Sequence, residues 1–427
     1  MGGVRTGAGV AVLRDSIYIG QWRDGIFHGA GVLLDCHNSW YQGQWIAGRR
    51  CGSGTRSSRD GVKYEGEWEE DVMHGVGVLK VGERTYNGHW QNGLQEGTGT
   101  YTSEGGRYIG SWRAGERSGQ GDYQYLNGDR YEGQWQAGER NGEGLYTTKQ
   151  GSTYSGQWRA GVRQGHGAMQ AAHGDIYNGE WKNDVQHGSG MCEQACGAQY
   201  DGEWQNGLYH GRGTFVESNN DTYDGEWAGG LKQGAGSFAW SSGDLYTGEW
   251  HAGLCNGKGS FTAGHGDKYE GSWRKGKKHG RGTLVLNSGD RYCGEFADGL
   301  KHGEGELVWS SGVLRGCKYV GQLQQGVIQG HGVYTTADGE YYQGEFVAGE
   351  RCGDGRCLLA NKDEYSGQWA KGQWMGEGRY VWAGYDGNVP GQYQGQWVAG
   401  VKHGSGIYKL ANGESFQGEW NYGLRKN

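Results

Sequence analysis

The chain has 427 residues, and its composition is far from that of ordinary globular domains, because 92 residues are glycine and only one is proline. Hydrophobic residues make up 34% of the chain, while 20 Trp, 28 Tyr and 7 Phe supply an unusual aromatic content. The net charge of −7 gives no electrostatic basis for binding duplex nucleic acid. Uncharged stretches are short and interrupted by glycine, so the sequence predicts no transmembrane helix.

The N-terminal segment and the cysteines bear on the cellular compartment. Residues 1–6 begin no apolar stretch of signal-peptide length. Nine cysteines without a secretory signal favour reduced thiols. We therefore expect a cytoplasmic protein.

An internal repeat accounts for almost the whole chain. Each unit starts with Tyr-x-Gly-x-Trp, and counting the Tyr as position 0, further glycines follow at +7, +11 and +13. Thirteen of the 17 intervals between units are 23 residues long. The 18 units start at Tyr18, Tyr41, Tyr64, Tyr86, Tyr108, Tyr131, Tyr154, Tyr177, Tyr200, Tyr223, Tyr246, Tyr269, Tyr292, Tyr319, Tyr342, Tyr365, Tyr393 and Phe416.

Each unit has the pattern of a β-hairpin. Rings and glycine alternate with polar residues in the first half, as in Tyr131-Glu132-Gly133-Gln134-Trp135, and this period of two is typical of a strand. The second half alternates as well and carries an apolar residue at +15, for which Arg56 is the exception. We expect a tight turn from +7 to +10 between the halves. The predicted fold is an all-β, elongated, single-layer antiparallel solenoid of hairpins.

Glycine has two expected roles in this fold. Position +7 is Gly in all units except two, where Asp71 and Asp184 stand, and both residue types tolerate positive φ. Position +7 is therefore predicted to be a left-handed turn residue. The glycines at +2, +11 and +13 leave room for aromatic rings to cover the neighbouring strand.

Chemical motifs are absent or explained by the repeat. Gly-x-Gly recurs in every unit, so it gives no evidence for a phosphate-binding loop, and no P-loop sequence occurs. Neighbouring units are about 9.5 Å apart, too far for their side chains to share a zinc ion. We predict no enzyme activity, metal or cofactor. Histidines at +10, interpreted as turn residues that hydrogen-bond the hairpin backbone, are His28, His74, His187, His210, His279, His302 and His403.

Two groups of residues are candidate binding sites. Five cations lie around a single turn at Arg274, Lys275, Lys277, Lys278 and Arg281, and they are either a contact for an anionic lipid headgroup or a solvated turn. The rings of five successive units form a possible groove for a protein partner. These rings are Tyr131, Trp135, Tyr154, Trp158, Tyr177, Trp181, Tyr200, Trp204, Tyr223 and Trp227.

The chain divides into four parts by the regularity of the repeat. Residues 1–17 resemble a second half-unit that caps a regular array at 18–305, and 393–427 hold the last repeat and a half-unit. The part between, 306–392, carries insertions at 306–318 and 379–392, and Leu323 replaces the expected Trp. We expect this part to kink the array or to carry a partner loop. Because each end offers an unpaired strand edge, we also expect self-association as a homodimer or end to end.

The unit at Tyr269, with Gly271, Trp273, Gly276, His279, Gly280 and Gly282 in the order Tyr-x-Gly-x-Trp-x-x-Gly-x-x-His-Gly-x-Gly, resembles the MORN repeat (membrane occupation and recognition nexus). The resemblance extends over residues 7–423 and departs at Leu323, at the two insertions and where +10 is not His. The chain is similar to the repeat-only members of that family, which include cytoskeletal and ciliary proteins that are often dimers. Lipid binding is attributed to the family, but none of its residues maps here as a lipid site.

Two functions follow as hypotheses. The first is a scaffold in a cytoskeletal or ciliary (axonemal) assembly, located in the cytoplasm on the cytoskeleton or in a cilium or flagellum. The second is a peripheral membrane adaptor that binds phosphoinositides through residues 274–281.

Overall fold

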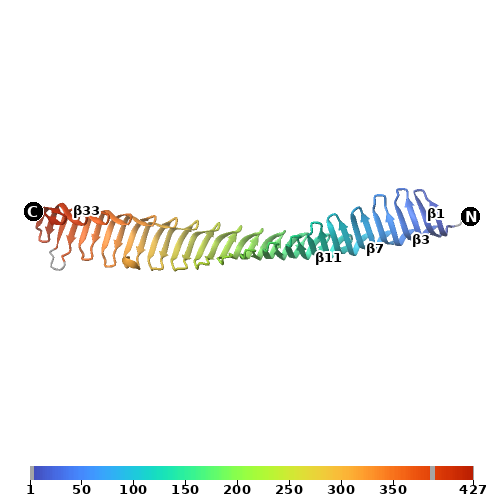
Figure 1. The fold of residues 1–427 in the computed structure, drawn as a ribbon, viewed down its shortest axis with the longest axis horizontal. Helices are drawn as coiled ribbons and strands as arrows, with labels where there is room; N and C mark the ends of the chain where they lie inside the picture. The colour runs from blue at the N-terminus through green and yellow to red at the C-terminus, as the bar shows by residue number, and fades with distance from the viewer. Residues whose placement is uncertain (1–3, 385–389, 427) are drawn as a thin grey trace. The chain divides into compact units, whose positions relative to one another are not determined.

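The computed structural model describes residues 4–384 and 390–426, so five residues of the second insertion, 385–389, lie outside the described part. Almost every described residue is in a β-strand or a tight turn, and Figure 1 shows the strands following one another in chain order. The chain falls into two compact units, residues up to Tyr209 and residues from His210 onward. No described helix is long and apolar enough to cross a membrane.

Strands of the first unit form an antiparallel meander in which each pairs with the next along the chain. They are β1 (Gly7–Val12), β2 (Ser16–Arg23), β3 (Ile26–Asp35), β4 (Trp40–Ile46), β5 (Arg49–Ser57), β6 (Lys63–Glu69), β7 (Val72–Val81), β8 (Arg84–Gln91), β9 (Leu94–Ser103), β10 (Gly106–Arg113), β11 (Glu116–Tyr125), β12 (Arg130–Gln136), β13 (Glu139–Thr147), β14 (Thr153–Arg159), β15 (Val162–Gln170), β16 (Ile176–Lys182), β17 (Val185–Glu193) and β18 (Gln199–Gln205).

The second unit repeats this topology, and β19 (Leu208–Val216) contains the boundary between the units. The further strands are β20 (Thr222–Ala228), β21 (Leu231–Ala239), β22 (Leu245–His251), β23 (Leu254–Thr262), β24 (Lys268–Arg274), β25 (Lys277–Val285), β26 (Arg291–Ala297), β27 (Leu300–Val308), β28 (Lys318–Gln324), β29 (Val327–Thr335), β30 (Tyr341–Val347), β31 (Glu350–Leu358), β32 (Glu364–Ala370), β33 (Gln373–Trp382), β34 (Gly391–Val398), β35 (Val401–Leu410), β36 (Ser415–Asn421) and β37 (Leu424–Arg425). A three-residue 3-10 turn, η1 (Gly312–Leu314), lies between β27 and β28.

The predicted hairpin is confirmed, but its turn is shorter than expected. The left-handed residues are +6 and +7, as in Ala137 (φ 50°) and Gly138 (φ 78°), and Asp71 and Asp184 have φ of 71° and 68°. The second strand then starts at +8, so the +10 histidines belong to a strand and not to the turn. Two successive left-handed residues match the twist of a two-residue hairpin, which is why the turn closes so quickly.

A bulge that recurs from hairpin to hairpin explains the glycine at +11. In the unit that starts at Tyr131, Gly133 pairs with Gly144 and Trp135 pairs with Arg140, so three residues of β13 face one residue of β12. The middle residue of the three, Gly142, has φ of 78°, which a residue with a side chain adopts only with strain. The bulge thus sets which side chains oppose each other in the rest of the hairpin.

The first insertion leaves the ladder intact. Strand β27 pairs with β28 through Gly305 with Gly321 and Leu307 with Tyr319, which is the register used between all neighbouring hairpins. Leu323 takes the place of Trp in the core and is buried. The extra residues form a turn outside the sheet. The strand pairing across this insertion is therefore regular and gives no sign of the expected kink.

Candidate functional site: the aromatic face

One face of each hairpin, called here the aromatic face, collects the side chains at +0, +4, +9 and +15. The pairing shows why, because Tyr131 opposes Tyr146 and Trp135 opposes Arg140. Cross-strand partners in an antiparallel pair point to the same side of the sheet. Residues at +1, +3, +12 and +14 point to the other side, called here the polar face.

The tyrosine at +0 lies flat over the paired glycines at +2 and +13. Its hydroxyl donates a hydrogen bond to the backbone carbonyl at +3, as from Tyr131 to Gln134 at 2.9 Å. A Cβ built on Gly133 would lie 2.5 Å from the Cα of Gly144, and one on Gly144 would overlap the ring of Tyr131. These glycines are therefore required by the close approach of backbone and ring.

The tryptophan at +4 joins neighbouring hairpins. Its indole Nε1 donates to the carbonyl of the +13 glycine in the preceding unit, as from Trp158 to Gly144 at 3.2 Å. Tyr131 packs edge to face against both Trp135 and Trp158, with ring centroids 5.2 and 5.4 Å apart. Tyr131 is thus held between its own tryptophan and the next one.

These contacts bury the rings predicted to line a partner groove, and that interpretation was wrong in its geometry. Tyr131 and Trp135 are 0% and 5% exposed, and burial raises the pKa of Tyr131 to about 12. A partner cannot reach the ring faces, because they pack on one another and on the glycine backbone. The buried set is Tyr131, Trp135, Tyr154, Trp158, Tyr177, Trp181, Tyr200, Trp204, Tyr223 and Trp227.

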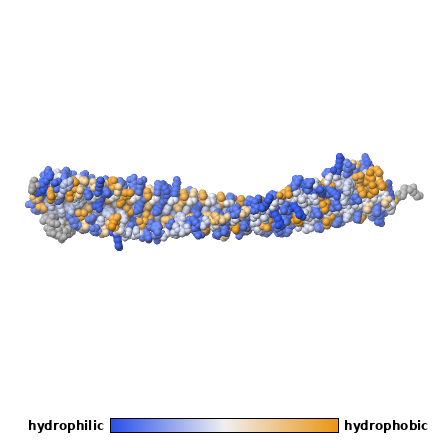
Figure 2. Space-filling model, viewed as in Figure 1, coloured by the Kyte–Doolittle hydropathy of each residue, from blue (hydrophilic) through white to orange (hydrophobic). Residues whose placement is uncertain are grey.

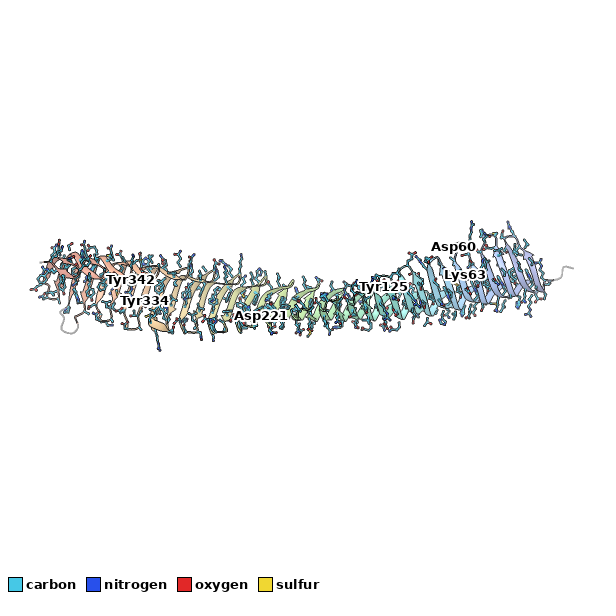
Figure 3. All side chains as sticks on the ribbon, viewed as in Figure 1. Asp60, Lys63, Tyr125, Asp221, Tyr334 and Tyr342 are labelled. Atoms are coloured by element: carbon cyan, nitrogen blue, oxygen red, sulfur yellow. The ribbon has the colours of Figure 1, made fainter. Side chains whose placement is uncertain are left out.

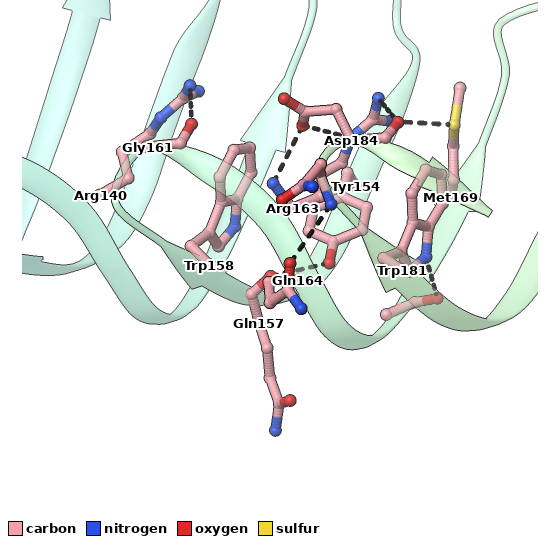
Figure 4. A network of polar contacts seen from close by, with 12 residues as sticks. Arg140, Tyr154, Gln157, Trp158, Gly161, Arg163, Gln164, Met169, Trp181 and Asp184 are labelled. Atoms are coloured by element: carbon pink, nitrogen blue, oxygen red, sulfur yellow. Dashed lines mark hydrogen bonds and ion pairs between the residues drawn. The ribbon is translucent and has the colours of Figure 1, made fainter. Parts of the chain in front are cut away.

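The residue at +9 forms the accessible surface of the aromatic face, and sequence reasoning missed it. In the first unit of the chain it is often arginine, whose guanidinium lies over the tryptophan of the next hairpin. Figure 4 shows Arg140 over Trp158 and Arg163 over Trp181, at 4.2 and 4.3 Å from the ring centroids. The recurrence of Arg or Lys two residues after the +7 glycine is the signal that could have revealed this row.

Arginines at +9 also hydrogen-bond the next hairpin turn, as the guanidinium of Arg140 does to the carbonyl of Gly161. This contact explains the two aspartates at +7. Asp184 accepts from Nε of Arg163 at 3.0 Å, and Asp71 accepts from Nε of Arg50 at 2.9 Å. Aspartate at +7 thus adds a carboxylate acceptor for the arginine 21 residues before it, whereas Gly138 and Gly161 offer Arg117 and Arg140 only a backbone carbonyl. Aspartate also tolerates the left-handed backbone.

In the second unit of the chain, lysines fill the +9 position at Lys232, Lys278, Lys301 and Lys402. Each is half-buried, and its ammonium lies close to aromatic rings, for example 3.9 Å from the centroid of Phe238 for Lys232 and 5.1 Å from that of Tyr269 for Lys278. Burial lowers the pKa of all four ammonium groups. Within residues 4–384 and 390–426 these ammoniums make no hydrogen bond and no ion pair.

The structure separates the five cations that were predicted to act together. Lys278 opposes Trp273 and lies on the aromatic face, whereas Arg281 opposes Glu295 on the polar face. Arg274, Lys275, Lys277 and Arg281 are exposed, and Arg274 forms an ion pair of 3.7 Å with Asp298. A planar lipid surface could therefore meet at most the exposed four, because Lys278 points to the other side of the sheet.

The +10 side chains cap the turn of the next hairpin. His403 Nδ1 accepts the backbone N–H of Tyr422 at 3.4 Å, and the Gln164 side chain accepts that of Asn183 at 3.2 Å. The predicted hydrogen bond to a hairpin backbone is thus made by His279 and His403, and it reaches the neighbouring unit. In the described part of the chain, Nδ1 of His187 is buried without a hydrogen-bond partner. Among the described residues no group of three or more His, Cys, Asp and Glu could hold a metal ion.

Carboxylates connect the turns between hairpins along one edge of the sheet. Asp221, labelled in Figure 3, accepts the backbone N–H of Ser241 at 2.7 Å, and Asp129 accepts that of Lys149 at 2.9 Å. Hydrogen bonds favour the charged form and lower the pKa of both carboxyl groups, chiefly the backbone N–H of Ser241 for Asp221, and the hydroxyl of Tyr146 followed by the backbone N–H of Lys149 for Asp129. The turn carboxylates with this contact are Asp129, Asp175, Asp221, Asp244, Asp267, Asp290 and Asp363.

The polar face carries few features that point to chemistry. A trough of about 1070 Å³ in the second unit is lined by Lys258, Glu270, Arg281 and Glu304, which give it no single sign of charge. The +3 glutamates serve the fold, because the side chain of Glu249 accepts the backbone N–H of Lys258 at 3.0 Å across the bulge. The arrangement resembles a surface for contacts more than a catalytic pocket.

On the polar face, strands β1, β2 and β3 differ from the rest because they carry apolar side chains there. Val10 opposes Ile19, and Val12 opposes Ile17, which in turn opposes Leu34. Figure 2 shows hydrophobic residues gathered at the N-terminal end, and Val10 and Val12 are 62% and 79% exposed. An apolar area of this kind marks a contact surface.

Comparison with known proteins identifies the repeat. The family model described as "MORN repeat" matches 17 segments of the chain. They are residues 18–36, 41–63, 64–80, 86–106, 108–130, 131–153, 154–175, 177–195, 200–222, 223–245, 246–267, 269–291, 292–313, 319–341, 342–364, 365–387 and 393–415. No curated protein sequence matches this chain.

Solved structures similar to this chain include two single domains. The TCP domain of SAS-4 (dCPAP) from Drosophila melanogaster, solved with a proline-rich motif of Ana2 (dSTIL), is 10% identical with a TM-score of 0.25, and the match covers 39% of this chain and 85% of that domain. The TCP10 domain of Danio rerio CPAP is 9% identical with a TM-score of 0.25, and the match covers 52% of this chain and 93% of that domain.

Proposed function

We propose, from the premise that this chain belongs to the MORN repeat family, that it is a non-catalytic scaffold that binds proteins of a cytoskeletal or ciliary assembly. MORN repeats are in general protein- or lipid-binding repeats. The proposal rests on one observation, the accessible row of +9 side chains that repeats from hairpin to hairpin over a rigid aromatic core. Such a surface suits an extended partner, because one side chain per hairpin, most often Arg or Lys, is offered at regular intervals.

The scaffold proposal is tested by the location of a tagged chain before and after extraction with a non-ionic detergent. We expect the chain in the cytoplasm, retained after extraction on a filamentous or ciliary structure, and cross-linking there identifies its neighbours. Loss of the whole signal with the soluble fraction would overturn the proposal. As a control, a tagged chain that lacks the +9 charges reports whether retention depends on the aromatic face.

Self-association belongs to the same proposal. Strand β1 pairs with β2 along one edge, and no described strand covers its other edge, where Val10 and Val12 add exposed apolar surface. An uncovered edge with apolar side chains and no charged or proline residue within the strand favours pairing with another chain. Light scattering at tens of micromolar is expected to give a dimer or larger species, and substitution of Val10 and Val12 by Lys is expected to shift it to monomer. A wild-type monomer under these conditions would contradict this part.

Lipid binding is the second candidate, favoured by the four exposed cations Arg274, Lys275, Lys277 and Arg281. Each cation near an anionic membrane contributes about 1 kcal/mol, so four could hold the chain weakly at such a surface. Flotation with vesicles that contain phosphoinositide tests it. If the membrane is the ligand, Lys275→Glu with Lys277→Glu abolishes flotation, while Lys278→Glu on the opposite face has a smaller effect.

A further inference from the structure

The +9 lysines of the second unit differ from the +9 arginines of the first, because no described residue accepts a hydrogen bond from their ammonium groups. The guanidinium of Arg163 is engaged by Asp184, and that of Arg117 donates to the carbonyl of Gly138 at 2.7 Å. The ammonium groups of Lys232, Lys278 and Lys301 donate to no other described residue. All three are half-buried over rings, so they are held in place but keep donors for a ligand.

The carboxylates that act on these lysines electrostatically form no ion pair with them. They are Glu217 and Asp221 for Lys232, Asp267 for Lys278 and Asp290 for Lys301, and no ion pair joins any of them to its lysine in the described part of the chain. Asp221, Asp267 and Asp290 accept a backbone N–H of the next turn instead, as Asp267 does from Asn287 at 2.8 Å. The lysine row thus remains a cationic strip over an aromatic floor, in a chain whose net charge is −7.

The spacing of this strip selects the conformation of a ligand. Equivalent residues of neighbouring hairpins are two strands apart, which is about 9.4–9.8 Å. A polyproline II helix advances about 9.3 Å in one turn of three residues, so every third side chain faces the same way with this repeat. In a β-strand, by contrast, residues three apart point to opposite sides. A polyproline II segment therefore matches the row both in distance and in direction.

We propose that Lys232, Lys278 and Lys301 bind an acidic segment of a partner protein in the polyproline II conformation. Neighbouring +9 positions run in the order Lys232, Cys255, Lys278, Lys301. The segment consequently carries carboxylates at i, i+6 and i+9, while residue i+3 lies over Cys255. This inference rests on the proposed function, since it names the chemistry of the partner that the aromatic face takes.

The test uses a fluorescent peptide of four Glu-Pro-Pro repeats, which places its glutamates on one side of a polyproline II helix. A control peptide of the same composition has the order Glu-Glu-Pro-Pro-Pro-Pro, repeated twice, which spreads the charges around the helix. Titration of the full chain is expected to give saturable binding of the first peptide, weaker by at least about tenfold for the second. Equal affinity for the two, or no binding of the first, overturns the inference.

Substitution of Lys278 and Lys301 by Met tests the site while the fold is preserved. Cys255 and Ile328 occupy the same position in neighbouring hairpins, so an uncharged side chain is compatible with it. We expect the double variant to keep its thermal midpoint and to bind the peptide at least about tenfold more weakly. Two control variants are expected to leave the affinity unchanged. Lys402→Met changes a lysine that also lies over aromatic rings but is far from the other three along the chain, and Lys277→Met changes the exposed residue next to Lys278. Equal losses in these controls would show general charge attraction and contradict the site.

One further measurement separates this inference from the proposed function. Suppose that the peptide fails to bind the wild-type chain, while both wild type and the Lys278→Met, Lys301→Met chain are retained on the detergent-extracted structure. The inference then falls and the scaffold stands. If wild type itself is not retained, the scaffold falls, whatever the peptide does. Binding of anionic vesicles that is lost in the double variant, without any peptide binding, would assign the lysine row to lipid and also overturn the inference.

Discussion

Arg163 and Asp184 lie 21 residues apart and join two neighbouring hairpins through three hydrogen bonds. The Asp184 carboxylate accepts from the backbone N–H and from Nε of Arg163 at 2.9 and 3.0 Å, and the Asp184 backbone carbonyl accepts from Nη2 at 2.7 Å. The same guanidinium stacks on Trp181 (Figure 4). Charge pairing and stacking therefore act on one side chain, and they can be separated by substitution.

Asp184→Gly restores the residue usual at +7 and retains the carbonyl that accepts from Nη2. Because the pair is partly exposed, we expect the free energy of unfolding to fall by less than about 1 kcal/mol. Arg163→Ala also removes the stacking and is expected to cost about 1–2 kcal/mol. Urea denaturation measures both, and equal losses would show that the carboxylate carries the whole contact.

Gly144→Ala tests the close approach of ring and backbone. The backbone of Gly144 is not in the left-handed region, so the substitution destabilises the chain only through the overlap of the new methyl group with Tyr131. We expect the free energy of unfolding to fall by about 3 kcal/mol. Gly138→Ala is the matched control, since it has φ of 78° and open space around it, and is expected to cost about 1 kcal/mol. The order of the two thermal midpoints checks the argument, and it fails if Gly138→Ala is the more damaging.

Trp181→Phe removes the hydrogen bond from Nε1 to the carbonyl of Gly167, which is 2.9 Å long. The ring position itself accepts phenylalanine, as Phe296 and Phe346 show in their own hairpins. We expect a loss of about 1–2 kcal/mol, mainly because a buried carbonyl is left without its donor. The reverse substitution, Phe296→Trp, is the control and is expected not to destabilise the chain in a thermal melt.

Stability at acid pH is expected to depend on the turn carboxylates. Hydrogen bonds from backbone N–H groups lower the pKa of Asp175, Asp221, Asp267 and Asp290 in the folded chain. Their contribution is present above the ordinary Asp pKa of about 3.9 and is lost as pH falls through the lowered folded values. The thermal midpoint should fall over that window, and it should fall less in a chain with Asn at these four positions.

At alkaline pH the buried tyrosines are expected to unfold the chain. Burial raises the pKa of Tyr131, Tyr154, Tyr269 and Tyr292 to about 12, so their stabilising effect is complete below about pH 10. It is lost as pH rises through the folded values, because the unfolded chain ionises first. Tyrosinate absorbance and circular dichroism should change together, and independent titration of the rings in a folded chain would contradict the prediction.

The sequence by itself determined the hairpin, the repeat and the left-handed residue at +7, because period-two alternation and glycine placement act within a few residues. Which side chains meet between hairpins was decided by the tertiary structure. The bulge places three residues opposite Gln134, and so brings Arg140 over Trp158 and a +10 side chain to the next turn. The rings of Tyr131 and Trp135 looked available for a partner in the sequence, yet they are buried, since Trp158 packs on Tyr131 and Tyr108 packs on Trp135, 27 positions away in each case. Contacts at that separation depend on strand register, because a shift of one residue moves every side chain to the other face of the sheet.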